Sequence, residues 1–353
     1  MKRLALGLIV VVVVGLGAAT SRQYFKTSAF EGAGETAALL SLPSEPKPVP
    51  PPEVSLIAVG DIMLSRNVAA KMRKYGPDYP FLKVADYLKT GDLVFGNLEL
   101  PITPGRVIKS GEMVFRAEPG SENVLKKFGF SILSLANNHT PNFGAKGLQD
   151  TFTYLKKAGI NYVGAGMNAT QAEAPVFIEK NGLKFAFLAY NDSDVVPVSY
   201  RADENRPGTA FMDKTKMTAA VKEAKSRADF VVVSMHSGVE YVHEPNKSQK
   251  DFARAAIDAG VEMVLGHHPH VIQRAEKYKD KYIFYSLGNF VFDQMWSWPT
   301  RRGLMLKLIF TKDGIKDVEF VPVLIEDYAQ PRIMEEGKVR DGVLQVLNKE
   351  LAG

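Results

Sequence analysis

The sequence predicts a layered α/β fold that contains a mixed β-sheet. From residue 54 onward, apolar runs of strand length alternate with segments of helical periodicity. Turn signals at Asn181-Gly182 and at residues 312–314 join neighbouring apolar runs as antiparallel hairpins. The chain has 353 residues, of which 46% are hydrophobic, so it can bury a large core. An α/β fold of this size is often a single domain.

The first residues have the layout of an export signal. Lys2 and Arg3 precede an unbroken apolar or small stretch over residues 4–19, which predicts a signal peptide or N-terminal membrane anchor over residues 1–20. The small residues at 17–19 would permit cleavage, whereas the valine run at 10–14 suits an uncleaved anchor. The basic flank places the remainder at the extracytoplasmic face of the cell membrane, or outside the cell if the segment is cleaved.

Prolines dominate the second half of the next region, which covers residues 21–53. Such a Pro-rich segment is typical of a semi-extended tether rather than of a core. We expect one folded domain over residues 54–330, followed by a C-terminal helical extension over residues 331–353.

Strand and helix patterns follow one another along this domain. Apolar runs predict strands at residues 56–59, 93–95, 132–136, 185–190, 230–233, 263–265 and 283–287. Helical periodicity predicts helices at residues 67–75, 121–128, 148–158, 214–227 and 249–259, the last of which ends at Gly260 as a C-cap.

Acidic, amide and histidine side chains come directly after most of these strands. Ligands of α/β sheets bind outside the carboxyl ends of the strands, so these side chains converge if the runs share one sheet. Convergent Asp, Glu, Asn and His side chains indicate a metal site. The residues concerned are Asp61, Glu99, Asn138, His139, His236, His268, His270 and Asn289.

The segment Gly266-His267-His268-Pro269-His270 is the sharpest of these motifs. In extended backbone, His268 and His270 point to the same side of the chain, which suits two imidazoles that reach one metal pair. The alternative is a histidine-rich turn without function. Neutral imidazole suits zinc, manganese, iron or nickel, so the ligand types leave the identity of the metal open.

Each remaining motif has a structural alternative when it is taken alone. Gly60-Asp61 is an ordinary turn pair, and Asn138-His139 fits an Asx turn. Glu99 fits a solvated strand end, although burial would require a partner for its charge. A structural turn at Asn289 and an amide that positions groups of the site fit the sequence equally well. The common place at strand ends favours the functional interpretation of the group.

Composition and missing motifs narrow the chemistry further. The absence of cysteine excludes disulfides, thiolate ligands, a cysteine nucleophile and a lipoprotein attachment site. Basic and acidic residues are interspersed at a net charge of +5, which predicts no nucleic-acid partner but favours an anionic one. The sequence contains neither a Walker-type phosphate loop nor a Gly-x-Ser-x-Gly elbow. Metal-activated water is therefore the expected nucleophile.

Six ordered motifs together resemble the CapA family of capsule-synthesis proteins, which is associated with poly-γ-glutamate. The resemblance extends over about residues 55–324 and implies a calcineurin-like metallophosphoesterase sandwich, in which mixed β-sheets are flanked by helices. The motifs are Gly60-Asp61-Ile62-Met63, Gly96-Asn97-Leu98-Glu99, Asn137-Asn138-His139, the hexapeptide at 236–241, Gly266-His267-His268-Pro269-His270 and the pentapeptide at 286–290.

The resemblance also implies roles for single residues. The implied ligands of one or two divalent ions are Asp61, Glu99, Asn138, His236, His268 and His270. Proton transfer is assigned to His139 or Glu240, and substrate contact to Asn97, Asn137, Asn289 and Tyr241. Two positions depart from the pattern. Ser237 stands where many relatives have an aromatic residue, and Met63 stands where the superfamily has a histidine ligand. The loss of that imidazole would weaken one metal position and leave a mononuclear or asymmetrically dinuclear site.

The implied function is that of a membrane-tethered, metal-dependent hydrolase or transferase outside the cytoplasmic membrane. Its expected substrate is an anionic envelope polymer in capsule synthesis. The family suggests poly-γ-glutamate as this polymer. Metal would lower the pKa of water toward ~7 and polarise the scissile carbonyl or phosphoryl group. The alternative is a non-catalytic module with a degenerate site, which binds nascent polymer or a membrane synthase complex. A cytosolic phosphodiesterase is a poorer interpretation, because the N-terminal segment argues against that compartment.

Overall fold

The computed structural model describes residues 52–109 and 111–351. The predicted signal or anchor, and all but the end of the predicted tether, lie outside the described residues. The described residues form one compact unit. Within the described ranges, every helix is too short or too polar to span a lipid bilayer.

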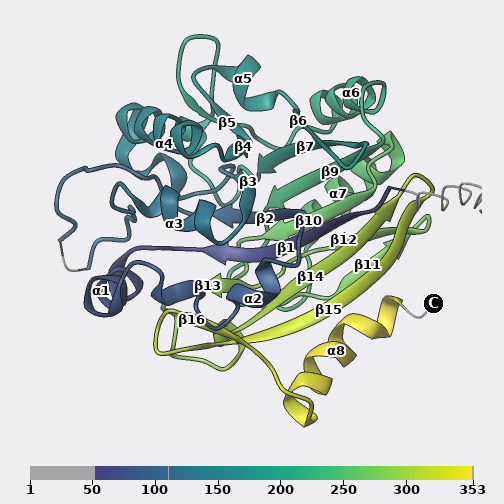
Figure 1. Ribbon diagram of the computed structural model, residues 1–353. Helices are drawn as coiled ribbons and strands as arrows, with labels where there is room; N and C mark the ends of the chain where they lie inside the picture. Colours follow the sequence, from purple (N-terminus) through teal and green to yellow (C-terminus); the bar gives the residue numbers. More distant parts are fainter. Residues whose placement is uncertain (1–51, 110, 352–353) are drawn as a thin grey trace, which may run out of the picture. The chain divides into compact units, whose positions relative to one another are not determined.

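The first sheet combines parallel strands in one half with antiparallel strands in the other half (Figure 1). Its order is β16-β15-β14-β1-β2-β3-β4, and the short strand β13 also pairs with β1. The strands are β1 (Val54–Ile62), β2 (Leu93–Leu98), β3 (Phe130–Ser134), β4 (Asn161–Val163), β13 (Asn289–Val291), β14 (Arg302–Thr311), β15 (Gly314–Glu326) and β16 (Gln330–Ile333).

The second sheet has the order β11-β12-β10-β9-β7-β6 and is parallel from β12 to β7. Its strands are β6 (Val176–Lys180), β7 (Leu183–Asn191), β9 (Phe230–His236), β10 (Met263–His267), β11 (Ala275–Tyr278) and β12 (Lys281–Phe284). A small separate pair consists of β5 (Ala165–Gly166) and β8 (Gly208–Thr209).

The two sheets pack face to face because their strands carry large apolar side chains on the facing sides. Phe95 of β2 stacks on Phe187 of β7 across the interface, with 6.0 Å between the ring centroids. Phe185 of β7 meets Phe310 of β14 edge-on at 5.0 Å. Complete burial of one such ring is worth about 1.5–3 kcal/mol, so a shared aromatic core holds the sheets together.

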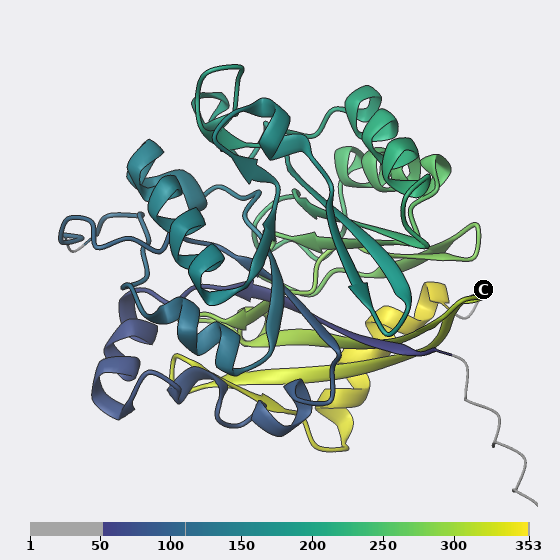
Figure 2. The same ribbon diagram turned by 45° about the horizontal axis from the view of Figure 1, so that its top comes forward.

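Helices cover the outer face of each sheet (Figures 1 and 2). The first sheet packs against α1 (Arg66–Tyr75), α2 (Ala85–Leu88), α3 (Ser121–Lys127) and α4 (Gly144–Ala158). The second sheet packs against α5 (Ala169–Glu173), α6 (Lys214–Lys225) and α7 (Lys247–Ala259). The C-terminal helix α8 (Lys338–Leu351) inserts Val343 and Leu347 into the core between the sheets.

The predicted mixed sandwich with flanking helices is confirmed in this arrangement. The hairpin at Asn181-Gly182 is also confirmed, and the positive φ angles of 48° and 78° are those that a tight hairpin turn requires. Helix α4 begins at Gly144, four residues before the predicted start, because a 3-10 turn over Thr140–Phe143 leads directly into it. Helix α7 begins at Lys247, where Asn246 and Gln249 form a capping box.

The candidate metal centre

The candidate site lies where strand ends of both sheets meet, not at the edge of one shared sheet. Asp61 is part of β1 and pairs in register with Asn97 of β2. His236 ends β9 and pairs in register with His267, which ends β10. A Cβ atom at Gly60 would lie 1.9 Å from the Gly288 carbonyl oxygen, so only glycine permits this close approach of the backbones.

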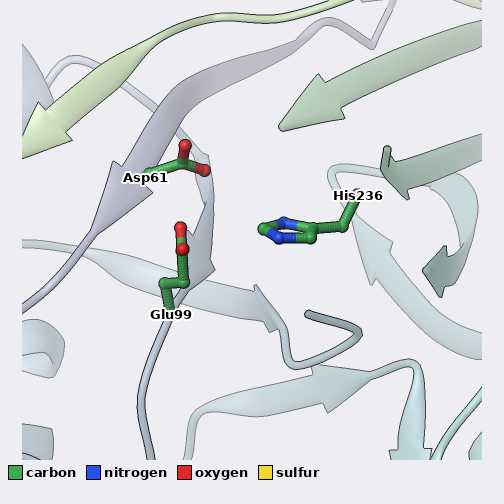
Figure 3. Close-up of side chains that lie close together, drawn as sticks. All are labelled: Asp61, Glu99 and His236. Atoms are coloured by element: carbon green, nitrogen blue, oxygen red, sulfur yellow. The ribbon is translucent and has the colours of Figure 1, made fainter. Parts of the chain in front are cut away.

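Asp61, Glu99 and His236 point toward one another and form the centre of the cluster (Figure 3). One ligand atom from each side chain lies within 4.8 Å of the other two. Asn97 connects these groups, because its Nδ2 donates to Asp61 Oδ1 at 2.8 Å and lies 3.4 Å from both Glu99 Oε2 and His236 Nδ1. All four side chains are buried.

His268 and His270 join this cluster. We predicted extended backbone for these two residues, and that prediction is wrong. Both residues follow the end of β10 and have φ angles of 99° and 56°, in the left-handed region. This conformation redirects the chain after the strand, and it places His270 Nδ1 3.3 Å from Asp61 Oδ2 and the His268 ring 4.7 Å from the His236 ring. Strained backbone of this kind is concentrated at functional sites.

Asn138 and His139 lie next to the same centre. Asn138 Oδ1 contacts His236 Nε2 at 3.0 Å. The ring of His139 packs against Phe115 with 4.0 Å between the centroids, and its Nδ1 contacts Asn142 Oδ1 at 3.0 Å. That oxygen also accepts the Phe115 backbone N–H at 2.8 Å, which identifies it as an acceptor. Nδ1 of His139 is therefore the donor, and Nε2 is its basic nitrogen.

The predicted substrate-binding amides Asn97, Asn137 and Asn289 are buried and bonded to the protein. Asn137 donates to Asn97 Oδ1 at 3.0 Å and accepts the Thr140 backbone N–H at 2.7 Å. Asn289 Oδ1 contacts His270 Nδ1 at 2.9 Å. These contacts orient the candidate ligands, and the expected substrate contacts of the three amides stay a prediction.

Glu240 and Tyr241 lie on the exposed rim of the site. The hydroxyl of Tyr241 accepts a hydrogen bond from Gln294 at 3.3 Å, and its ring meets Trp296 edge-on at 4.8 Å. Burial, together with the Glu240 charge, raises the pKa of Tyr241 to about 12, so the phenol stays protonated at neutral pH. Both rim residues remain accessible to a substrate, as their predicted roles require.

Burial and mutual contacts shift the pKa values of the acidic and basic side chains in the cluster. Burial opposes ionisation of Asp61, but contacts with His267 and His270 outweigh it and hold the pKa of Asp61 well below its usual range. Burial also opposes the charged form of His270, yet Glu99 and Asp61 raise its pKa to about 9. Burial, and then the charge of Asp61, raise the pKa of Glu99 well above its usual range. The raised pKa favours the protonated form of Glu99, so the Asp61 carboxylate and the His270 imidazolium are the main opposite charges of the cluster.

His139, His236 and His268 are neutral at neutral pH and can act as ligands. Burial lowers the pKa of His268 to about 3 and that of His139 to about 4. Burial, followed by the neighbouring His268, also lowers the pKa of His236 well below its usual range. A neutral imidazole has a free lone pair, which is the form that binds a metal ion.

Buried ligand atoms that lack a hydrogen bond support the fit of these residues to a divalent cation. Within the described part of the chain, Glu99 Oε1, both ring nitrogens of His267, and His268 Nδ1 are buried without a hydrogen-bond partner. Buried polar atoms are rarely left in this state. Asp61, Glu99 and His236 would hold the ion, with His268 and His270 beside them. The mixed oxygen and nitrogen donors leave zinc, manganese and iron open.

His267 is the residue that sequence reasoning left without a role. It is completely buried, and its Nδ1 lies 3.3 Å from Asp61 Oδ1. Its pairing opposite His236 could have identified it as part of the site. That pairing can be recognised only when the order of the strands in the sheet is known.

The two departures from the family pattern occupy structural positions. Met63 packs in the hydrophobic core of the first sheet, and its sulfur accepts the Ser65 backbone N–H at 3.1 Å. Ser237 donates to Asp192 Oδ2 at 2.7 Å.

Removal of two imidazoles should abolish tight metal binding. We expect His268→Ala/His270→Ala to bind divalent metal at least about 100-fold more weakly than the unmodified protein. Loss of the ligands themselves should reduce the affinity more than loss of residues that only orient ligands, which costs about 10–100-fold. Elemental analysis after dialysis and competition with a chromophoric chelator measure the loss. His243→Ala is the matched control, because His243 is exposed and its Nδ1 contacts the Ile272 carbonyl outside the cluster. Equal metal content in the double variant and in the control would contradict the proposed site.

The metal-free protein should lose stability as the pH rises. Since the pKa of His270 is raised from 6.5 to about 9, its contribution is complete below pH 6.5 and disappears as the pH passes 9. The lowered pKa values of His139, His236 and His268 affect stability only below pH 6.5. Urea unfolding with chelator present should show a decrease on the order of 3 kcal/mol over this range. If the free energy of unfolding of His270→Gln decreased equally over the same pH range, the assignment to His270 would be wrong.

Relatives of known name cover most of the chain. It is 35% identical over 306 residues to the capsule biosynthesis protein CapA of Bacillus anthracis, which covers 84% of this chain and 74% of the relative. It is 35% identical over 295 residues to the PGA biosynthesis protein CapA of Bacillus subtilis, with 83% and 77% covered. A probable polyglutamine synthesis accessory protein of Mycobacterium tuberculosis is 34% identical over 212 residues, with 57% and 56% covered.

Solved structures confirm the predicted calcineurin-like fold, at identities that show the fold alone. The calcineurin-like phosphoesterase YfkN from Bacillus subtilis has a TM-score of 0.51 at 12% identity, with 85% of this chain and 98% of that chain covered. A hypothetical protein from Thermus thermophilus has a TM-score of 0.50 at 16% identity, with 76% and 98% covered. The family model described as bacterial capsule synthesis protein PGA_cap matches residues 55–294. With the two Bacillus relatives, this match shows that the chain belongs to the bacterial capsule synthesis family that includes the CapA proteins.

Proposed function

We propose that this protein is a membrane-tethered, extracytoplasmic, metal-dependent hydrolase or transferase that acts on poly-γ-glutamate during capsule synthesis. The observation that carries the proposal is the buried cluster of Asp61, Glu99 and His236, which includes and adjoins ligand atoms that have no hydrogen-bond partner. Family membership supports the polymer context. The tether is supported by the basic, then apolar, N-terminal sequence.

The side chains around the cluster support a proton-transfer role for His139. A bound divalent cation would supply Lewis-acid polarisation of a carbonyl or phosphoryl oxygen and would make a water molecule more acidic. His139 is neutral at neutral pH, its Nδ1–H is held by Asn142, and its Nε2 can accept a proton. Packing against Phe115 fixes the ring, as a proton acceptor with defined geometry requires. Exposed Glu240 can exchange protons with solvent from the rim.

A second candidate function is a non-catalytic module that binds nascent polymer or a membrane synthase. It is favoured by Met63, which lies in the hydrophobic core where the metallophosphoesterase pattern has a ligand. A site with fewer ligands can hold a cation for binding without reaching the reactivity of a complete dinuclear centre.

Catalysis should depend on His139 separately from metal binding. Full-length protein supplied with manganese or zinc should shorten poly-γ-glutamate and release new amino termini. His139→Ala should lower kcat by about 10²–10⁴ while it leaves the metal content unchanged. Gel filtration of the polymer and amine labelling measure the reaction, with His243→Ala as the control. Normal capsule formation in cells that carry only a folded Asp61→Asn/His139→Ala protein would instead support the binding module.

Membrane attachment should depend on the first 20 residues. The full chain should sediment with membranes and be cut by protease added outside the cell, because the basic flank keeps the N-terminus inside. Deletion of residues 1–20 should leave the protein in the cytoplasm. Deletion of the equally long segment 31–50 is the matched control and should preserve attachment. A full chain that fractionates with the cytoplasm would contradict the tether, and the mass of the mature N-terminus distinguishes an anchor from a cleaved signal.

A further inference from the structure

A basic cleft of about 430 Å³ has a lining that includes none of the candidate metal ligands, and its role is so far unassigned. Helix α1 and the segment from residue 107 to 118, without the undescribed residue 110, form its walls. The charged residues that line this basic cleft are Arg66, Arg73, Lys109, Glu112, Arg116 and Glu118. Four positive side chains therefore face two negative ones.

Arg66 connects the basic cleft with the metal centre. Its guanidinium lies 4.5 Å from the centroid of the Phe115 ring, and the same ring packs against His139 with 4.0 Å between centroids. An ion pair with Asp293 fixes the guanidinium further, while Nε is buried without a hydrogen-bond partner. Arg66 also has a φ angle of 48°, a strained conformation that only a well-defined surrounding maintains. The side chain is thus held in place at the boundary between cleft and site.

Arg73 extends the positive charge away from the centre. It lies seven residues after Arg66, two turns along the same face of α1, or about 10 Å along the helix axis. Within the described residues, neither the Arg73 guanidinium nor the Lys109 ammonium has an ion-pair or hydrogen-bond partner. The two carboxylates are already neutralised, since Glu112 pairs with Arg106 and Glu118 with Arg116. The basic cleft consequently has uncompensated positive charge.

We propose that the basic cleft is a subsite that holds successive carboxylates of a glutamyl polymer and guides the chain to the metal centre. This inference rests on the proposed function and specifies where its substrate lies. Arg66 would bind the carboxylate nearest the centre, and Arg73 with Lys109 would bind one further along the chain. Glu112 and Glu118 can accept amide N–H groups, which a glutamyl chain offers at every unit and a polyphosphate does not. A polycarboxylate with amide links therefore fits the mixed lining better than a polymer of phosphates.

Charge reversal at Arg73 tests the subsite with little risk to folding, because the side chain is exposed and unpaired. Binding of fluorescein-labelled poly-γ-glutamate to the full-length protein is measured by anisotropy at low ionic strength, where exposed charges are least screened. We expect Arg73→Glu to weaken binding about tenfold or more, equivalent to at least about 1.4 kcal/mol. Arg73→Lys should stay within about twofold of the unmodified protein. The matched control is Lys74→Glu, the same charge reversal at the next residue, which lies outside the cleft and over the Tyr75 ring.

The outcomes separate this inference from the proposed function. Equal weakening by Arg73→Glu and Lys74→Glu, or no binding of poly-γ-glutamate at all, would overturn the subsite. Tighter binding of polyphosphate or single-stranded DNA than of poly-γ-glutamate, with the same loss in Arg73→Glu, would overturn the choice of a polycarboxylate. Metal content is measured in every variant and should not change. If His139→Ala keeps full activity while Arg73→Glu still loses polymer, the subsite stands and the proposed catalytic function fails.

Discussion

Compensation of the buried Asp61 carboxylate is the constraint on which the whole arrangement depends. This side chain is completely shielded from solvent, and an unpaired charge in such a place costs several kcal/mol. Its partners come from different segments: Asn97 from β2, and His267 and His270 from the end of β10. Correct charge pairing is therefore possible only when the two sheets meet in the right register.

A chain of hydrogen-bonded amide side chains connects the backbone after β3 to the candidate ligands and fixes their orientation. Asn137 Oδ1 accepts backbone N–H groups of His139 and Thr140, which fixes the direction of its amide. Asn137 then donates to Asn97, and Asn97 donates to Asp61. Each amide is oriented by the one before it, beginning with main-chain atoms whose roles are unambiguous. Ligand geometry is consequently set by the loop after β3 as much as by the ligands themselves.

The sequence was sufficient for the architecture and for most of the residues that meet at the centre. Apolar runs and turn pairs such as Asn181-Gly182 are local signals, and they predicted the strands, the hairpin and the polar strand ends. The division into two facing sheets and the role of His267 depend on strand pairing between distant segments, which local periodicity does not contain. The left-handed backbone at His268 and His270 was missed because residue type rarely signals it outside glycine.

The candidate ligands come from both sheets, so a bound ion would stabilise the packing of one sheet on the other. Asp61 and Glu99 belong to one layer, whereas His236, His268 and His270 belong to the other. An ion that binds all of them recognises only the assembled sandwich, so its binding free energy adds to the free energy that keeps the layers together. The bound ion would stabilise the contact between the two sheets. The free energy of unfolding would therefore increase with the concentration of free metal in the surrounding medium.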